Sequence, residues 1–198
     1  VFIGRAGAAV ARRASTLLDG AYHRKVIVVV GKGNNGADGR AAASLLARRG
    51  ARVEVLEAGE LAPGQVLERV DLVIDAAYGT GLQRAYRPPV AFSPVFAVDI
   101  PSGLDGVSGE VLAGGGALKA VATVTFAAYK PGLLLGSGPE LAGPVEVADI
   151  GLGRLVDATA RCWLMEDADV AVLLPPRSRD SYKWQSAVQV VAGTPGLT

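Results

Sequence analysis

The strongest constraint on the fold is an uninterrupted apolar run, Val26–Val30, which leads directly into a loop rich in glycine and asparagine. β-Branched residues that do not alternate with polar ones are typical of a strand buried on both faces of a parallel sheet, so a strand is predicted over Lys25–Val30. The loop spans residues 31–36. Helical spacing follows over Ala37–Arg49 and ends at Gly50. A strand, a loop and a helix in this order begin an α/β fold.

The same alternation recurs along the chain. An Ala-rich helix is predicted over residues 5–18, before the first strand. Further strands are predicted at Val53–Leu56, Asp71–Asp75, Val95–Asp99, Ala122–Phe126 and, at an edge, Val145–Ala148. Because strands and helices alternate, we expect a three-layer α/β/α Rossmann-like fold, with a mostly parallel central sheet and helices on both faces.

The character of the sequence changes at Arg161. The elements predicted after it are a strand, a short helix ended by prolines and a second strand, at Trp163–Met165, Asp167–Leu174 and Ala187–Ala192. Residues 177–186, between the helix and the second strand, are polar and irregular. This tail is typical of a second unit that is cut off, and the predicted domains are residues 1–160 and 161–198.

Composition excludes several classes of function. The net charge is +1 and no basic stripe is present, which argues against nucleic-acid binding, and every apolar run is too short to span a bilayer. The single cysteine, Cys162, allows no internal disulfide, which favours a reducing, cytoplasmic compartment. The single histidine, His23, lies in a polar lead-in to the first strand and is interpreted as a surface residue. Because residue 1 is Val, we expect a trimmed start, and a lost targeting peptide stays compatible with the sequence.

Ligands of open α/β sheets bind outside the carboxyl ends of the strands, so the residues there are the first candidates. Gly31–Gly39 follows the first strand and matches G-x-G-x-x-G. Its glycines would let the backbone approach a phosphate at the start of a helix, and Glu57, at the end of the second strand, is spaced as a ribose-binding acid. A tight turn with Asp38 in the first helical turn explains this segment equally well.

Three other strand ends carry unusual side chains. Asp75 precedes Gly79-Thr80-Gly81, which is either a second phosphate or substrate loop or a solvated cap. Asp99 precedes a Pro-Ser-Gly turn, whose Ser102 is a weak nucleophile candidate because the segment lacks the first glycine of the G-x-S-x-G elbow. Lys130 follows the fifth strand and is either an acid–base group, a charge partner or a surface lysine.

These strand ends should converge on one crevice that contains Asn35, Asp75, Asp99, Ser102 and Lys130. Asn35, Asp75 and Ser102 offer oxygen ligands without histidine or cysteine. This composition suits an alkali or alkaline-earth ion better than a transition metal.

The ordered set of motifs resembles the NAD(P)H-hydrate epimerase family, the YjeF N-terminal domain. The similarity lies in four segments. Segment 33–39 is similar to the family's G-N-N-G-G-D-G, and segment 73–81 to its V-D-A with G-T-G. Segment 99–103 is similar to its D-I-P-S-G, and segment 125–132 to its T-F with K-P-G. The resemblance covers roughly residues 3–153 and includes the Arg-Ala-Gly of the first helix.

The resemblance implies an isomerase that interconverts the R and S forms of hydrated NAD(P)H. Asp99 and Lys130 would be its catalytic acid–base residues, and one potassium ion would be held by Asn35, Asp75 and Ser102, with no organic cofactor beyond the substrate. The residues that would contact the substrate are Asn34, Asn35, Gly36, Ala37, Asp38, Gly79, Thr80, Gly81, Leu82, Gln83, Arg84, Ala85 and Asp99. Ala37 replaces a glycine of the family, and we expect its methyl group to be tolerated if its backbone is helical.

The tail resembles the opening of the ribokinase-like, ADP- or ATP-dependent NAD(P)H-hydrate dehydratase domain, a lyase that follows the epimerase in bifunctional enzymes. Tyr182-Lys183-Trp184 is a poor match to that family's H-K-G. The family's catalytic motifs would lie beyond Thr198, so no dehydratase activity is expected of this chain alone.

Two other functions stay open. A conventional NAD-dependent dehydrogenase would account for G-x-G-x-x-G and Glu57, and a non-catalytic nucleotide-binding or scaffold domain would account for the fold. The sequence leaves open the preference for hydrated NADH or NADPH and the oligomeric state, a homo-oligomer included.

Overall fold

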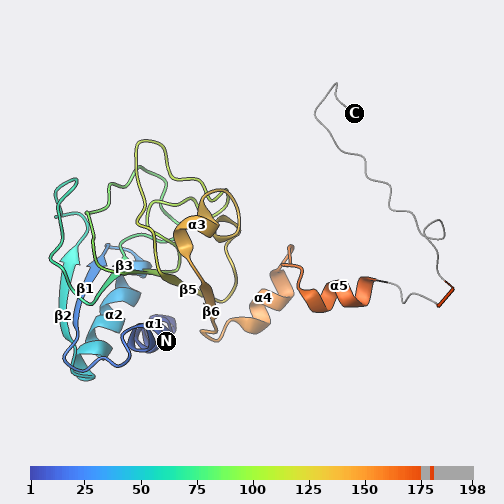
Figure 1. Ribbon diagram of the computed structural model, residues 1–198, viewed down its shortest axis with the longest axis horizontal. Coiled ribbons are helices and arrows are strands. Elements are labelled where there is room, and N and C mark those ends of the chain that lie inside the picture. Colours follow the sequence, from blue (N-terminus) through green and yellow to red (C-terminus); the bar gives the residue numbers. More distant parts are fainter. Residues whose placement is uncertain (175–178, 181–198) are drawn as a thin grey trace. The chain divides into compact units, whose positions relative to one another are not determined.

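The computed structural model describes residues 1–174 and 179–180, and the chain divides into two units, Val1–Thr159 and Ala160–Thr198. The first unit contains a six-stranded parallel sheet in the order β2-β1-β3-β4-β5-β6 (Figure 1). The strands are β1 Lys25–Val30, β2 Arg52–Glu57, β3 Leu72–Ala76, β4 Val95–Val98, β5 Ala122–Phe126 and β6 Val145–Ala148. The predicted α/β class with a mostly parallel sheet is confirmed.

The central strand β1 pairs with β2 on one side and with β3 on the other. All of its valines and its isoleucine are buried, as the unbroken apolar run predicted. The chain order therefore reverses at β1, where β2 leads toward one edge and β3 toward the other. Such a switch point leaves a crevice outside the carboxyl ends of the strands.

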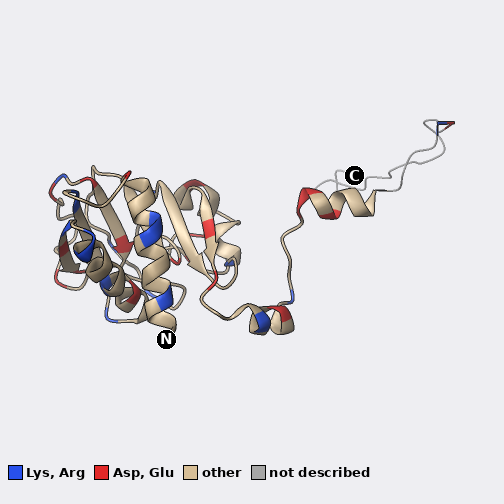
Figure 2. Cartoon of the chain, turned by 90° about the horizontal axis from the view of Figure 1, so that it is seen from below, with Lys and Arg blue, Asp and Glu red and all other residues tan. Residues whose placement is uncertain are grey.

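One face of the sheet is covered by two long helices, α1 Phe2–Leu17 and α2 Asn34–Arg48. They approach closely because small residues line their contact, as at Gly7, where an added Cβ would lie 2.5 Å from the Cβ of Ala41. Figure 2 shows Lys and Arg positions, in blue, at intervals along the helix that begins at the N-terminus, with tan stretches between them. Val10 and Leu46 are fully buried in the core beneath them.

The predicted start of the second helix is wrong, because α2 begins at Asn34, before the predicted Ala37. Gly33 has an extended backbone and serves as the N-cap residue. Gly36 allows the early start, because its first turn packs on the Gly31 carbonyl oxygen, only 1.9 Å from where a Cβ would lie. Asp38 consequently lies beyond the first helical turn, in which the sequence analysis had placed it.

The other face of the sheet is covered mainly by loops. Segments 58–71, 77–94 and 99–121 connect successive strands without a helix, and the short elements η1 Pro131–Leu133 and α3 Gly138–Ala142 complete the layer. Leu67, Leu82 and Tyr86 from these segments pack on Ile27 and Val73 of the sheet. The third layer is therefore present, but most of it is irregular.

The remaining helices are α4 Gly153–Thr159, which ends the first unit, and α5 Asp167–Leu173, which confirms the predicted short helix. Glu166 and Asp169 form a capping box at the start of α5. The predicted strand at Trp163–Met165 is wrong: these residues are exposed and irregular, and no strand pairs with them in the part of the chain described.

The prolines that were expected to end α5 lie outside the described residues. So do the predicted second strand of the tail, Ala187–Ala192, and almost all of segment 177–186. Across residues 1–174 and 179–180, no helix has the length and apolar character needed to cross a membrane.

Candidate functional site

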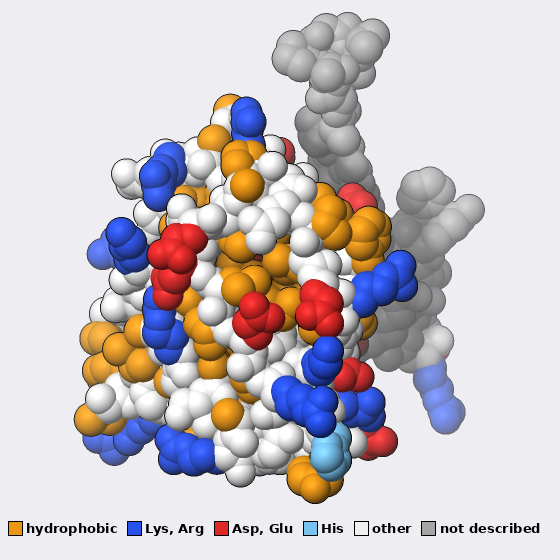
Figure 3. Space-filling model, turned by 90° about the vertical axis from the view of Figure 1, so that its left-hand side faces the viewer, with side chains coloured by type: hydrophobic (Ala, Val, Ile, Leu, Met, Phe, Trp, Pro, Cys, Tyr) orange, Lys and Arg blue, Asp and Glu red, His pale blue; other side chains and the backbone are white. Residues whose placement is uncertain are grey.

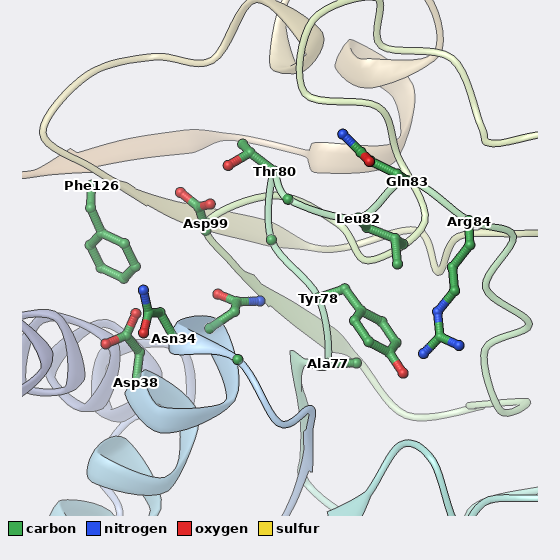
Figure 4. Close-up of a pocket in the computed structure, with 14 residues that line it drawn as sticks. Asn34, Asp38, Ala77, Tyr78, Thr80, Leu82, Gln83, Arg84, Asp99 and Phe126 are labelled. Atoms are coloured by element: carbon green, nitrogen blue, oxygen red, sulfur yellow. The ribbon is translucent and has the colours of Figure 1, made fainter.

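A cavity of about 790 Å³ lies at the switch point, outside the carboxyl ends of β1, β3 and β4. Figure 4 shows Asn34 and Asp38 projecting from α2 toward Phe126, with Tyr78 and Arg84 at the opposite end. The residues that line the cavity are Gly33, Asn34, Asn35, Asp38, Ala77, Tyr78, Gly79, Thr80, Gly81, Leu82, Gln83, Arg84, Asp99 and Phe126.

The glycines after β1 serve two different purposes. A Cβ on Gly31 would lie 2.0 Å from the carbonyl oxygen of Ala77, and one on Gly39 would lie 2.5 Å from the Cβ of Ala76. These glycines are therefore required by the packing of the turn and of α2 on the sheet. Gly33 alone in this turn has nothing within 4 Å of an added Cβ, and it lines the cavity. Gly33 and the N–H groups of the first turn of α2 are therefore the parts of this segment that could meet a ligand in the cavity.

Asn35, in the cavity wall at the start of α2, has a side chain that lacks hydrogen-bond partners in the described part of the chain. It is 9% exposed, and its side-chain oxygen and nitrogen are both buried without a hydrogen-bond partner among the residues described. An unpaired buried amide costs free energy, so a native site that contains one is usually completed by a ligand, ion or water. Ala37 lies inside α2, so the helical backbone expected at this position is confirmed.

Asp38 is a buried carboxylate in the cavity wall. Burial, together with the charge of Asp99, raises the pKa of Asp38 to about 6. The carboxyl group is therefore ready to change its charge close to neutral pH, and it makes no hydrogen bond within the described part of the chain.

Beneath the cavity, Asp75 and Ser102 form a buried network. The Ser102 hydroxyl lies 2.6 Å from Oδ1 of Asp75, and the Ser102 N–H donates to Oδ2 at 2.9 Å. The same hydroxyl accepts from the Tyr78 N–H at 2.9 Å and lies 3.0 Å from the Tyr78 carbonyl oxygen. Burial raises the pKa of Asp75, and hydrogen bonds from Ser102 and Ala77 oppose that rise. This network ties the segment after β3 to the segment after β4.

Strands β4 and β5 end in the same kind of turn. Asp99 has φ 68° and Ala127 has φ 65°, and each is spanned by a hydrogen bond from the next residue's N–H to the preceding carbonyl, at 2.9 Å across Asp99 and 2.8 Å across Ala127. These are γ-turns with positive φ, a strained backbone that costs on the order of 1–3 kcal/mol for a non-glycine residue. Strain of this kind persists where the surrounding structure holds it in place, and it is common at functional sites.

The two turns bring together an acid, a hydroxyl and an amine. Lys130 Nζ lies 2.7 Å from Oδ1 of Asp99 and donates to Oγ1 of Thr125 at 2.7 Å and to the Phe126 carbonyl at 2.9 Å. Thr125 in turn lies 3.2 Å from Asp99 Oδ1. Asp99 lines the cavity, whereas Lys130 stands behind it. Of these three groups, Asp99 is therefore the one placed to contact a ligand in the cavity.

The segment after β3 forms the far wall. Tyr78 stacks edge-to-face on the buried Tyr86 with ring centroids 5.0 Å apart, and the Arg84 guanidinium lies 5.9 Å from the Tyr78 ring centre. This stacking holds the Arg84 guanidinium, which makes no ion pair with the residues described, against the cavity. Arginine in such a position suits a phosphate or another anion.

Most of the sequence-predicted contact residues line the cavity, and three do not: Gly36, Ala37 and Ala85. Gly36 and Ala37 belong to the start of α2 but do not line the cavity, while Ala85 follows the end of the lining segment. Asp75 and Ser102 lie under the cavity and Asn35 at its surface. The carboxylate of Glu57 is paired with Arg40 and lies outside this cavity. His23 is exposed, in agreement with its interpretation as a surface residue.

The sequence analysis missed four lining residues, Gly33, Ala77, Tyr78 and Phe126. Each lies within a motif that was noted, between a strand end and the polar residues chosen from it. They were not chosen because the prediction looked for polar side chains and these residues are apolar or aromatic. Their position next to a strand end was the signal that could have found them.

Comparison with known proteins identifies the family of the chain. The family model described as "YjeF-related protein N-terminus" matches residues 1–67 and 59–132. The NAD(P)H-hydrate epimerase of Weissella koreensis is 35% identical, with 65% of this chain and 71% of that protein covered. The NAD(P)H-hydrate epimerase of Limosilactobacillus fermentum is 38% identical, with coverages of 63% and 74%.

A longer relative and a solved structure extend the comparison. The bifunctional NAD(P)H-hydrate repair enzyme Nnr of Salinibacter ruber is 34% identical over 85% of this chain, which spans only 40% of that protein. The crystal structure of yeast ynu0 shares the fold, with a TM-score of 0.53 at 19% identity, and covers 91% of this chain and 86% of its own. From the family model and these relatives together, we conclude that the chain belongs to the YjeF-related N-terminal family.

Proposed function

We propose that this chain is an NAD(P)H-hydrate epimerase, an isomerase that interconverts the R and S forms of hydrated NADH and NADPH in nucleotide repair. The observation that carries the proposal is the Asp99–Lys130 pair, 2.7 Å apart, with Asp99 in the wall of a cavity of nucleotide size. The names of the relatives support the same activity.

The reaction needs proton transfer at one oxygen. The hydrated ring carries a hydroxyl on the carbon next to its nitrogen, and this carbon changes configuration either by losing and regaining the hydroxyl or by ring opening. Asp99 faces the ligand and acts as the acid–base group, while Lys130 and Thr125 hold its Oδ1 through contacts of 2.7 and 3.2 Å. Both routes use a proton delivered to the leaving atom and returned afterwards.

A potassium ion suits Asn35, Asp75 and Ser102. The buried, unpartnered amide of Asn35 and the buried carboxylate of Asp75 supply hard oxygen donors, and a cation would offset the cost of burying both. No group of three or more histidine, cysteine, aspartate or glutamate side chains suited to a metal occurs among the described residues. When bound, the ion would supply positive charge to the phosphates of the substrate.

The other contacts follow from position. Asn34–Asp38 at the start of α2 and Gly79–Ala85 on the opposite wall would hold the nucleotide, with Gly36, Ala37 and Ala85 contributing by shaping the backbone rather than by lining the cavity. The N–H groups of α2 and the Arg84 guanidinium would meet the pyrophosphate.

The proposal extends to the context of the chain. Residues 161–198 would be a linker and the opening of a dehydratase domain, which works with the epimerase, because bifunctional relatives match this chain over 40% of their length. We place the protein in the cytoplasm, in keeping with its single cysteine, and light scattering would decide whether it is a monomer or a homo-oligomer.

The test uses a mixture of R and S hydrated NADH with a strictly S-specific dehydratase, and NADH recovery is followed with and without this chain. Consumption of the R form only when the chain is present establishes epimerisation. A recovery that stops at the S fraction contradicts the proposal.

Two controls separate the alternatives. A dehydrogenase would oxidise bound NADH in the presence of a substrate, which the epimerase would not do. A non-catalytic binder would bind NADH and give the same recovery for the wild-type chain and for Lys130→Ala.

A further inference from the structure

A second cavity, of about 580 Å³, opens beside the first, on the side of β1 and β2. Its lining residues Gly33, Tyr78 and Arg84 also line the main cavity, so the two spaces adjoin. The function proposed above uses the main cavity for the hydrated ring and leaves the second unassigned. A dinucleotide is long enough to occupy both.

Glu57 ends β2 and lines the second cavity. Its Oε1 is paired with Nη2 of Arg40, whose Nη1 donates to the Gly31 carbonyl at 3.0 Å. Arg40 thus anchors Glu57 to the glycine turn. Within the described part of the chain, Oε2 of Glu57 has no hydrogen-bond partner, so one oxygen of a positioned carboxylate is free to accept a hydrogen bond.

Charged side chains line both cavities. Asp38 and Asp99 line the main cavity, Lys32, Glu57 and Glu60 line the second, and Arg84 lines both, so each space offers groups of both signs. Figure 3, a view from the β2 side, shows acidic and basic side chains around a hollowed apolar centre. A dinucleotide carries a complement to each sign, an anionic pyrophosphate for the cations and ribose hydroxyl donors for the carboxylates.

We propose that the second cavity binds the adenosine half of the substrate and that Glu57 accepts a hydrogen bond from its ribose hydroxyl, which makes the chain prefer hydrated NADH over hydrated NADPH. The proposal rests on the epimerase function proposed above and adds to it the choice between the two substrates. An acid at the end of the second strand suits a free 2′-hydroxyl and repels a 2′-phosphate.

Lys32 and Arg84 could favour the opposite preference, for hydrated NADPH. Both are exposed cations in the same cavity, and they would attract a 2′-phosphate if they lay closer to it than Glu57 does. The position of Glu57 at the end of β2, anchored by Arg40, favours the ribose assignment, with the two cations left for the pyrophosphate.

The test compares NADH with NADPH, which differ only in the 2′-phosphate, as binding probes in calorimetry. The wild-type chain is expected to bind NADH about tenfold more tightly, since a hydrogen bond to a charged group is worth roughly that factor. Glu57→Gln keeps an acceptor for Arg40 and is expected to bring the two dissociation constants within about threefold. Glu54→Gln, on the same strand but outside the cavity, is the matched control and should keep the wild-type ratio.

Epimerisation supplies the second readout, as the ratio of kcat/KM for the two hydrated substrates. A merely structural effect of Glu57→Gln would lower both values alike and leave the ratio unchanged, which would overturn the assignment. Equal binding of NADH and NADPH by the wild-type chain, or tighter binding of NADPH, would also overturn it. If no variant epimerises either substrate while the binding ratio behaves as expected, the epimerase proposal fails and the ribose site stands.

Discussion

The two faces of the sheet are covered in different ways. α1 and α2 cover one face with regular helices whose close contact depends on alanine and glycine, as where Gly39 packs on Ala76. The other face is covered by loops that continue into the walls of the cavity, as in the segment from Ala77 to Arg84. Regular packing carries stability on the first face, and the irregular layer can be shaped around a ligand on the second. Substitutions on the two faces should therefore affect stability and activity differently.

The largest effect is expected at Asp99. Asp99→Asn keeps a side chain that tolerates positive φ but removes the carboxylate, so kcat for epimerisation should fall about 10²- to 10⁴-fold. The free energy of unfolding in urea should fall by no more than about 3 kcal/mol, because Lys130 loses its charged partner but keeps an amide oxygen as acceptor. Asp149→Asn is the matched control, since Asp149 also directly follows a strand, is exposed and lies outside the cavity. A loss of stability that accounts for the loss of activity would contradict the separation.

Val28 and Val29 allow the two faces to be compared directly. They are neighbours on β1, both almost fully buried, and their side chains belong to the helix-covered and loop-covered cores respectively. Val28→Ala should cost about 2–3 kcal/mol and Val29→Ala about 1–2 kcal/mol, because loops relax into a cavity more readily than packed helices do. Urea unfolding of both variants measures the difference. Equal costs would show that the two layers are equally rigid.

Two glycines of one segment should behave in opposite ways. Gly39→Ala places a methyl group 2.5 Å from the Cβ of Ala76 and should destabilise the chain by about 1–3 kcal/mol through overpacking, with kcat of the folded protein retained. Gly33→Ala meets nothing within 4 Å and has an extended backbone, so it should cost less than about 1 kcal/mol, the difference between glycine and alanine as an N-cap residue. Because Gly33 lines the cavity, its added methyl should instead weaken NADH binding in calorimetry.

The smallest effect concerns pH. The pKa of Asp38 is raised from 3.8 to about 6 in the folded chain, so the folded state holds this proton more tightly than the unfolded state does. The stability that the folded state gains by holding this proton is therefore fully present below pH 3.8, declines as pH rises and is lost above about 6. Asp38→Asn should be more stable than the wild type by about 1–2 kcal/mol at pH 7.5 and equal to it below pH 4. Urea unfolding at the two pH values tests the difference, which should not appear for the exposed Asp149→Asn.

The sequence alone determined the order and class of the strands in the first unit. The valine run of β1 and the polar residues at four strand ends were sufficient to predict a parallel sheet with a crevice, because burial on both faces and the position of strand ends are local consequences of the chain. The bounds of β1, β5 and β6 were predicted without error. The start of α2 was missed, since it depends on Gly36 packing against the Gly31 carbonyl, a contact that spacing does not reveal.

Only the tertiary structure decided which polar residues line the cavity and which lie behind or beneath it. It placed Asp99 in the cavity wall and Lys130 behind it, buried Asp75 with Ser102 and left the Asn35 amide without a partner. It also turned Glu57 away from the main cavity toward a second one. Loop paths, and the contacts between segments far apart in sequence, choose among these arrangements. Hydrogen bonding and burial depend on three-dimensional neighbours, which the order of residues does not contain.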